Sequence, residues 1–175
     1  AEYAVVPATD VFAVPEALDL ASAAVLGCAV FTAYGAVAHA GRVRPGDRIA
    51  VVAAGGVGLN IVQLARVFGA SQVIAVDVAE AKLATAAALG ATDVVDASAA
   101  DPVAAVRELT GGDGVDVAFE ALGRPQTVQQ AFKMARDGGS VVAVGIGAGA
   151  AAAEIEITHM VRREIRLVGS FGART

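Results

Sequence analysis

The sequence contains few of the residues that mark secreted or nucleic-acid-binding proteins. Its 175 residues include one cysteine and no tryptophan, and aromatic side chains make up 5% of the chain. A single cysteine excludes an internal disulfide, which fits a reducing compartment. Only 13 Lys and Arg stand against 18 Asp and Glu, and nothing resembles a basic stripe, so we expect no nucleic-acid partner. The first residues lack the basic and apolar regions of a signal peptide, and we expect a cytoplasmic protein.

A long uncharged stretch, Leu20–Gly41, raises the question of a membrane span. Polar residues such as Ser22, Thr32 and His39 interrupt it, so it does not have the pattern of one lipid-facing helix. Alanine contributes much of the apolar character of this protein, and alanine favours helices in soluble proteins too. The sequence therefore predicts no membrane partner.

Apolar runs alternate with helical stretches along most of the chain. The runs predicted as strands are Ile49–Ala53, Val73–Val76, Asp93–Val95, Val115–Phe119, Ser140–Val144 and Ile165–Val168. The stretches predicted as helices are Leu59–Phe68, Lys82–Leu89, Pro102–Leu109 and Gln126–Ala135. Runs of β-branched residues without polar alternation are typical of parallel strands covered on both faces. The alternation predicts an α/β fold with a doubly wound, parallel, six-stranded sheet.

Several segments outside these units have patterns of their own. Glu2–Val6 is predicted as a strand, and Ala17–Ala40 as helices that lead into the sheet. The alternation in Glu154–Thr158 predicts the approach to an edge strand. Asp113-Gly114 and residues 137–139 each precede a strand, so both are predicted as turns.

One junction between a predicted strand and a predicted helix carries the glycine-rich loop Gly55-Gly56-Val57-Gly58. A strand that enters a glycine turn and opens a helix is the arrangement that binds the pyrophosphate of a dinucleotide. Gly55 lets the backbone approach the phosphates, Gly58 lets the helix pack closely on the strand, and the helix N-terminus attracts the anion. Ala53 stands where the usual fingerprint has its first glycine, and we expect a negative φ there. The candidate cofactor-binding residues of the loop are Gly55, Gly56 and Val57.

The next predicted strand ends on Asp77, about 20 positions after the loop. A carboxylate at this place can accept hydrogen bonds from both hydroxyls of an adenosine ribose. It also repels the 2′-phosphate of NADP, and Val78 offers no cation to receive that phosphate. We therefore predict a Rossmann domain that binds NAD rather than NADP. The alternative for Asp77 is a helix cap or a solvated loop charge.

Other nucleotide-binding folds match less of the sequence. No Gly-Lys-Ser/Thr follows a glycine loop, which excludes a P-loop. Neither Tyr3 nor Tyr34 is followed by a lysine four residues later, which removes the catalytic pair of the short-chain dehydrogenases. A methyltransferase that binds S-adenosylmethionine stays open, because it also uses a glycine loop and an acidic ribose contact.

A series of ordered motifs supports a narrower interpretation. They are Gly27–Gly35, Val43–Asp47, Ile49–Gly58, Val76-Asp77 with Lys82, Leu89–Thr92, Phe119–Gly123, Val144–Ile146 and Gly169–Gly172. Over almost its whole length the chain closely resembles the zinc-dependent alcohol dehydrogenases of the medium-chain dehydrogenase/reductase family. The shared order of so many motifs argues against a chance match.

The resemblance implies roles for individual residues. Cys28 matches a ligand of the catalytic zinc, Thr32 a residue close to the nicotinamide, and Lys82 a residue that reaches the adenosine ribose. Phe171 matches a residue whose backbone holds the carboxamide. The positions that match the lining of the cofactor crevice are Ala121, Leu122, Val144 and Ile146.

The resemblance also implies a division of the chain and an activity. Residues 1–24 correspond to a remnant of the catalytic, GroES-like domain, and residues 25–175 to the NAD-binding domain. The implied reaction is hydride transfer between an alcohol or carbonyl substrate and NAD, with zinc in the full-length enzyme and a homodimer or homotetramer as the assembly. The other zinc ligands are expected upstream of Ala1, so we expect this chain to be inactive alone. The alternatives are a zinc-independent quinone or enoyl reductase of the same superfamily and a non-catalytic NAD-binding module.

Overall fold

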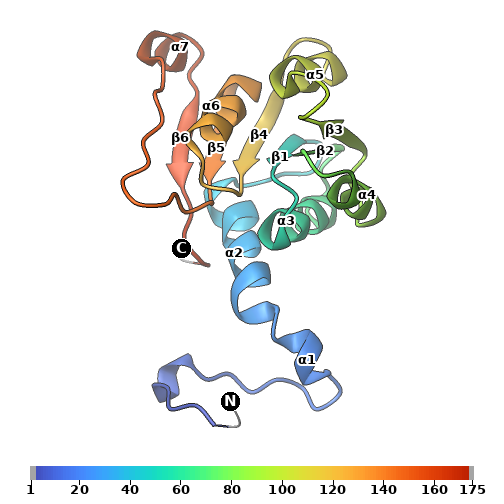
Figure 1. Ribbon diagram of the computed structural model, residues 1–175, viewed down its shortest axis with the longest axis vertical. Coiled ribbons are helices and arrows are strands. Elements are labelled where there is room, and N and C mark those ends of the chain that lie inside the picture. The colour runs from blue at the N-terminus through green and yellow to red at the C-terminus, as the bar shows by residue number, and fades with distance from the viewer. Residues whose placement is uncertain (1–2, 174–175) are drawn as a thin grey trace.

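The computed structural model describes residues 3–173, which build a single six-stranded sheet (Figure 1). The strands are β1 Arg48–Val52, β2 Gln72–Asp77, β3 Asp93–Asp96, β4 Val115–Glu120, β5 Ala135–Ala143 and β6 Arg166–Gly169. Their order is β3-β2-β1-β4-β5-β6, and every neighbouring pair is parallel. The predicted doubly wound parallel sheet is therefore confirmed.

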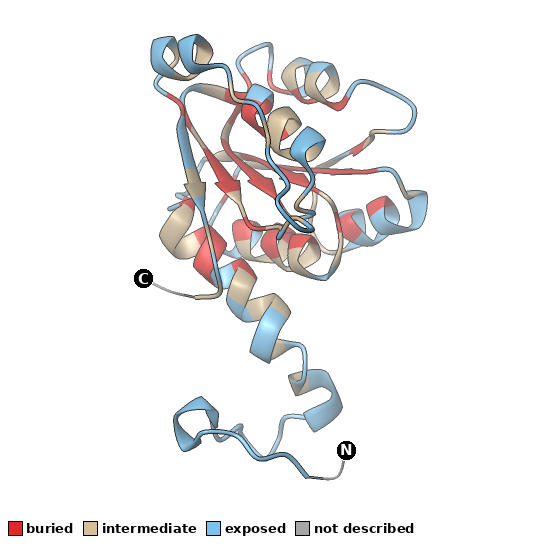
Figure 2. Ribbon diagram, turned by 60° about the vertical axis from the view of Figure 1, so that its left-hand side comes forward, coloured by how far each residue is buried: buried red, intermediate tan, exposed pale blue. Residues whose placement is uncertain are grey.

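Helices cover both faces of the sheet, because successive side chains of a strand point to opposite faces. The helices are α3 Gly56–Val67, α4 Glu80–Ala88, α5 Pro102–Leu109, α6 Pro125–Met134 and α7 Ile157–Arg162. In β1, Ile49 and Val51 join a first core with α3 and α4, whereas Ala50 and Val52 join a second core with α5 and α6. Figure 2 shows central strands that are buried between helices whose outer sides are exposed. Burial on both faces explains why the strands are continuous apolar runs.

Short helical segments form a stalk that enters the domain from below in Figure 1. They are α1 Leu20–Ala23, the π-helical η2 Leu26–Val30, α2 Phe31–Tyr34 and the π-helical η3 Gly35–Ala40, after the 3-10 turn η1 Ala8–Asp10. Ala33, Ala36 and Val37 are fully buried in the first core, whereas residues 3–20 are all exposed. By length and composition alone the run Leu20–Ala40, with a mean hydropathy of 1.8, could cross a membrane. Its second half, however, contributes Ala33, Ala36 and Val37 to the domain core. This agrees with the prediction of helices that lead into the sheet.

One segment predicted as a strand is not a strand, and the segment predicted as the approach to an edge strand contains the start of a helix. Residues 3–6 of the predicted strand Glu2–Val6 have no regular structure, and Glu2 lies outside the described residues. Their side chains are exposed, and no strand of the described chain pairs with them. In Glu154–Thr158, residues 154–156 are unpaired and α7 begins at Ile157. Ile155 is partly buried and packs against the second core, so the alternation there reflects one packed side chain and not strand pairing. The segment leads through α7 to β6, the strand at the edge of the sheet, as predicted.

Strand β5 begins earlier than predicted, at Ala135. Residues 137–139, predicted as a turn, lie within this strand, where its register against β4 shifts. Gly138 has a φ of +71° and accommodates the irregularity. The other predicted turn is present, because Gly114 has a φ of +94° directly before β4.

Candidate functional site

The loops that follow β1 and β4 run to opposite faces of the sheet, and two cavities lie beside them. β1 leads into α3, which packs in the first core, whereas β4 leads into α6, which packs in the second. The two strands are adjacent and parallel, so both loops leave from the carboxyl edge of the sheet. In open α/β sheets, ligands bind at this change of direction. The carboxyl edge at β1 and β4 is therefore the candidate site.

The glycine-rich loop leaves the N-terminus of α3 open. Gly55 precedes the first turn of α3, and no side chain caps the helix. A Cβ atom added at Gly55 or Gly56 would meet no heavy atom within 4 Å, so the space beside the loop is free of protein. Unpaired N–H groups and the positive end of the helix dipole fit an anion here. At Gly58 an added Cβ would lie 2.0 Å from the carbonyl oxygen of Ala53, which explains the close packing of helix on strand.

Ala53 has a φ of +78°, so the expectation of a negative φ at this position is wrong. In this left-handed region a Cβ atom costs about 1 kcal/mol. Hydrogen bonds hold the conformation on both sides of the peptide. The N–H of Ala53 donates to the carbonyl of Val76 (2.8 Å), and the N–H of Ala54 donates to Oδ2 of Asp77 (2.8 Å). The attachment of the loop to β2 therefore overrides the backbone preference of alanine.

Asp77 ends β2 and is only 7% exposed, because its carboxylate is held by neighbouring backbone. Oδ1 accepts hydrogen bonds from the N–H groups of Val78 (2.8 Å) and Ala79 (3.1 Å). Oδ2 accepts the bond from Ala54 and lies 3.7 Å from Nζ of Lys82. The residue is therefore neither a helix cap nor a solvated charge. It joins β2 to the glycine loop, a structural role that sequence reasoning missed.

One cavity, of about 340 Å³, opens beside Asp77. Lys82 lines it as expected, and Val78 and Leu122 supply apolar surface. Arg124, which sequence reasoning missed, also lines it, directly before α6. A carboxylate, two cations and apolar strand ends in one small cavity fit a ribose with an aromatic base.

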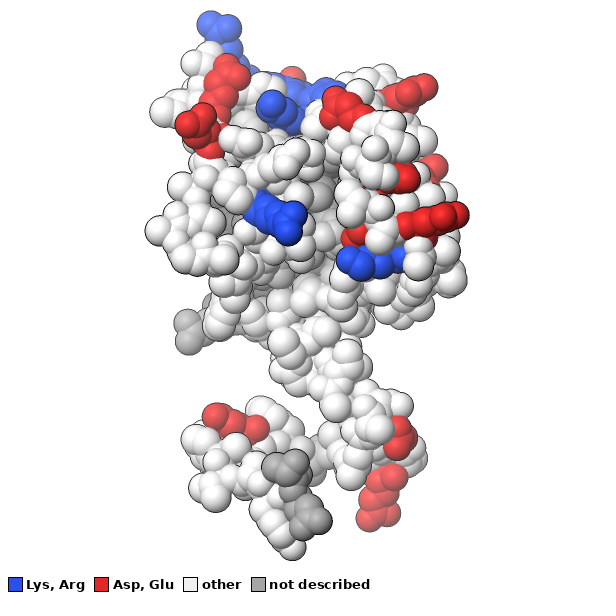
Figure 3. Space-filling model, viewed as in Figure 1, with Lys and Arg blue, Asp and Glu red and all other residues white. Residues whose placement is uncertain are grey.

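A second cavity, of about 520 Å³, lies where the stalk meets the domain. It brings together the predicted residues Cys28, Thr32, Val57, Ala121, Leu122, Val144, Ile146 and Phe171. The close approach of distant segments depends on Gly35, where an added Cβ would lie 2.1 Å from the carbonyl oxygen of Gly172. Figure 3 shows few charged side chains around the junction of stalk and domain, whereas they gather over the upper part of the domain. This cavity therefore suits a flat ring more than a phosphate.

The loops after β4 and β5 form a continuous wall because glycines let their backbones touch. A Cβ atom at Gly145 would lie 2.0 Å from the backbone nitrogen of Gly123, and one at Gly123 would lie 2.4 Å from the carbonyl carbon of Ile146. Gly123 also has a φ of +84°, which favours glycine. Leu122, at the centre of this wall, lines both cavities. The wall therefore forms part of the boundary of both halves of the site.

Glu120 ends β4 beneath this wall and has no exposed surface. Its Oε1 accepts hydrogen bonds from the N–H groups of Leu122 (3.0 Å) and Gly123 (2.8 Å) and from the hydroxyl of Thr127 (2.6 Å). Its Oε2 has no hydrogen-bond partner among the described residues. The sequence motif includes Glu120, but its spacing gives no sign of this role, since only the fold brings the carboxylate under the loop.

The described residues do not form a metal site. Residues 3–173 contain no group of three or more His, Cys, Asp or Glu side chains that could hold a metal ion. Cys28 is exposed and is a free thiol. A catalytic zinc takes three protein ligands, and one thiolate does not retain it against water. Cys28 lies in the second cavity, but the described chain by itself does not fit a zinc ion.

The family model for zinc-binding dehydrogenases matches residues 56–175. Among characterised relatives, L-threonine 3-dehydrogenase of Bacillus licheniformis is 39% identical over 144 residues, which is 81% of this chain and 40% of that protein. The chain thus spans about two fifths of the length of this relative.

Solved structures show the same architecture. An alcohol dehydrogenase zinc-binding domain protein from Burkholderia ambifaria has a TM-score of 0.88 and 35% identity, over 91% of this chain and 43% of that chain. A Sinorhizobium meliloti protein, described as a zinc-binding dehydrogenase and solved with NADP bound, has a TM-score of 0.87 and 34% identity, over 92% of this chain and 47% of that chain. In both cases the similarity covers more than nine tenths of this chain.

Proposed function

The chain belongs to the zinc-binding dehydrogenase family, and on that premise we propose that it is the NAD-binding part of an alcohol dehydrogenase-type oxidoreductase. One observation carries the proposal. Two cavities adjoin the open N-terminus of α3, one beside Asp77 and one where stalk and domain meet, and Leu122 lines both. A dinucleotide has the matching parts: a pyrophosphate between an adenosine and a nicotinamide nucleoside.

Each part of the site has a distinct task in this proposal. The first turn of α3 binds the pyrophosphate through Gly55, Gly56 and Val57. Asp77 and Lys82 bind the adenosine ribose in the smaller cavity. The proposed preference for NAD over NADP rests on Asp77, whose carboxylate repels a 2′-phosphate, while Lys82 and Arg124 at the same cavity oppose this effect.

The larger cavity receives the nicotinamide. Thr32 and the backbone at Phe171 orient the ring, and the apolar side chains of Val57, Leu122 and Ile146 keep water from it. The bound nicotinamide supplies the hydride acceptor for oxidation of an alcohol. The remaining crevice residues are Ala121 and Val144, which line the same cavity.

Zinc belongs to this proposal only for the longer enzyme. Cys28 lies in the cavity proposed for the nicotinamide, where it can contribute one ligand. Because the described chain offers no set of three ligands, no step of the reaction is assigned to zinc here. Residues 1–24 are proposed as a remnant of the catalytic domain, and the substrate as a small alcohol or carbonyl compound.

The assembly is proposed as a homodimer or homotetramer in the cytoplasm. Strand β6 is at one edge of the sheet, with its outer backbone groups unpaired in the described chain. Such an edge is a natural place for a second copy to pair. Light scattering tests this, and a monomer at all concentrations would remove it.

Fluorescence titration of the chain with NADH and NADPH tests the cofactor proposal. We expect NADH to bind at least about tenfold more tightly, which is about 1.4 kcal/mol. Asp77→Asn keeps an acceptor oxygen for the glycine loop but lacks the charge, so we expect it to narrow this ratio. No binding of either nucleotide, or equal affinities in the unmodified chain, would contradict the proposal.

Asp96→Asn is the matched control, because Asp96 is the register partner of Asp77 on β3 and does not line the cavity. The Ser98 hydroxyl and backbone N–H hold the pKa of Asp96 below its ordinary value. We expect this variant to leave the ratio of the two affinities unchanged. If Asp96→Asn changes the ratio of the two affinities as much as Asp77→Asn does, the preference depends on the overall charge at this edge and not on a contact made by Asp77.

A further inference from the structure

Glu120 has an environment that stability alone does not explain. It is the only Asp or Glu among residues 3–173 with no exposed surface, and no Lys or Arg forms an ion pair with it in that part of the chain. One of its two oxygens also has no hydrogen-bond partner there. Burying a carboxylate in this way is costly, and an apolar side chain of similar volume fills such a space at lower cost. We therefore look for the role of Glu120 in the groups that bind its other oxygen, Oε1.

Those groups belong to the wall between the two cavities. Oε1 accepts both backbone N–H groups of the turn at Leu122 and Gly123. The backbone carbonyl of Glu120 accepts the N–H groups of Val144 (2.8 Å) and Gly145 (3.1 Å) from the loop after β5. One residue thus holds both loops of the wall, through its side chain on one side and its main chain on the other.

We propose that Glu120 is a positioning residue for the dinucleotide. Its Oε1 holds the turn at Leu122 in the conformation in which that side chain borders both cavities. Without this acceptor the two N–H groups turn toward other partners, and Leu122 leaves its place between the two halves of the site. The inference rests on the proposed function, because it assigns the purpose of the turn to NAD binding.

Two substitutions at Glu120 separate its acceptor role from its volume. Glu120→Leu fills the space but accepts no hydrogen bond, and we expect it to weaken NADH binding by about tenfold or more. Glu120→Gln keeps a side-chain carbonyl for the same donors, and we expect affinity within about threefold of the unmodified chain. If Glu120→Leu binds NADH as the unmodified chain does, or Glu120→Gln binds as poorly as Glu120→Leu, the inference is wrong.

Asp116→Leu is the matched control for damage to the strand. Asp116 is on the same strand, four residues before Glu120, and lines neither cavity of the site. We expect this variant to be less stable but to bind NADH within about threefold of the unmodified chain. If it loses affinity as Glu120→Leu does, disturbance of β4 explains both and the positioning role is overturned.

Hydrogen exchange at the backbone amides of Leu122 and Gly123 measures the turn without any cofactor. We expect exchange to rise by about tenfold in Glu120→Leu and to change little in Glu120→Gln. Exchange at these amides could rise in Glu120→Leu while the unmodified chain does not bind NADH. This result would refute the proposed function but would support the conclusion that Glu120 holds the turn at Leu122. Unchanged exchange in Glu120→Leu would overturn that hold. If Glu120→Leu does not fold, loss of amide protection or affinity in Glu120→Gln overturns the inference, and retention of both supports it.

Discussion

Strand β4 carries a carboxylate near each of its ends, and the surroundings of the two differ. Asp116, near the amino end, pairs with Arg48 and Arg136. Glu120, at the carboxyl end, is bound by backbone N–H groups and a hydroxyl and has no cation in contact. The same strand thus carries an ion-paired carboxyl near one edge of the sheet and, at the other, a carboxyl that is hydrogen-bonded but forms no ion pair among the described residues.

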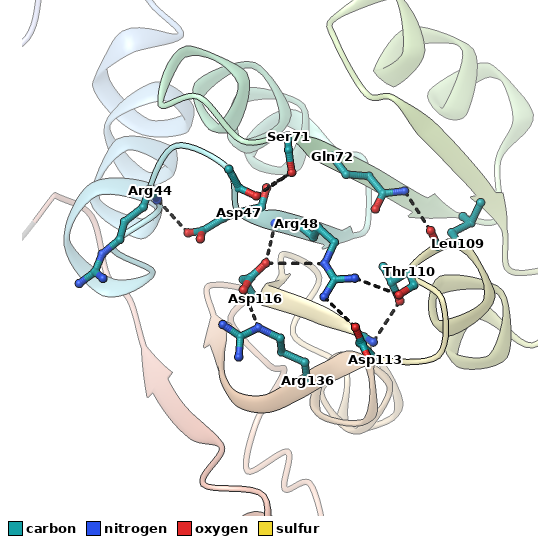
Figure 4. Close-up of polar contacts among 12 residues, drawn as sticks. Arg44, Asp47, Arg48, Ser71, Gln72, Leu109, Thr110, Asp113, Asp116 and Arg136 are labelled. Carbon is teal, nitrogen blue, oxygen red and sulfur yellow. Dashed lines mark hydrogen bonds and ion pairs between the residues drawn. The ribbon is translucent and has the colours of Figure 1, made fainter.

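Figure 4 shows the network at the amino edge. Oδ2 of Asp116 accepts the N–H of Arg48 (2.7 Å), and Oδ1 accepts Nε of Arg136 (2.5 Å). Nη1 of Arg48 donates to the carbonyl of Thr110 (2.9 Å), where α5 ends. Charged groups from β1, β4 and β5 therefore bind one another or the backbone of the same domain.

At the carboxyl edge, some polar groups have no hydrogen-bond partner among the described residues. The N-terminus of α3 has no side-chain cap, and Oε2 of Glu120 has no partner among the described residues. Glycines there let backbones approach more closely than any Cβ would allow. The difference teaches that unmet hydrogen-bonding capacity, more than the number of charges, distinguishes the proposed binding edge of this sheet.

The largest effect is expected where the carboxyl edge depends on backbone contact. In Gly58→Ala the new Cβ would lie 2.0 Å from the carbonyl oxygen of Ala53, so α3 or the loop must move. We expect the free energy of unfolding to fall by about 3 kcal/mol in urea denaturation. Gly55→Ala is the control, because its Cβ enters open space and should change stability by less than about 0.5 kcal/mol. Equal losses in the two variants would show that close packing at Gly58 does not limit the fold.

A smaller effect is expected at the amino edge, where Asp116 pairs with Arg48 and Arg136. Asp116→Leu removes the carboxylate that pairs with Arg136 and one of the two that pair with Arg48, which keeps Asp113. All three side chains of the network are partly exposed, at 28%, 42% and 17% for Arg48, Arg136 and Asp116. Because solvent screens such pairs, we expect a loss of about 2 kcal/mol, below that of a fully buried pair. Thermal unfolding measures it. A loss below about 0.5 kcal/mol would show that this network contributes no more than ordinary surface ion pairs do. The two edges would then not differ in the way described above.

The smallest effect has the opposite sign. Ala53→Gly relieves the Cβ of a residue with a φ of +78°, and glycine adopts this conformation at no steric cost. The greater freedom of glycine in the unfolded chain offsets part of the gain, so we expect stabilisation by about 0.5 kcal/mol. Differential scanning calorimetry would detect it as a small rise in Tm. Destabilisation would show that the hydrogen bonds of Ala53 and Ala54 already relieve the strain.

The sequence by itself determined the sheet and the order of its units, because continuous apolar runs between helical stretches have few other ways to be buried. It also indicated many of the candidate site residues: Asp77 ends β2, the glycine loop follows β1, and Ala121, Leu122, Val144 and Ile146 follow β4 and β5, all at one edge of a parallel sheet. Cys28 and Thr32 lie on the stalk, and the fold brings them to the same cavity. The strand predicted at Glu2–Val6 is absent from residues 3–6, because a short apolar run does not by itself show a pairing partner.

Only the tertiary structure decided how that edge is held together. The positive φ of Ala53 follows from hydrogen bonds to Val76 and Asp77 on a strand more than twenty residues away. The role of Glu120 follows from the meeting of two loops above one buried side chain. Local preference fixes which residues form a strand or a helix, whereas distant contacts fix the conformation of a loop. The physical reason is that a loop has no repeating hydrogen bonds of its own, so its backbone groups take the partners that the folded chain brings to them.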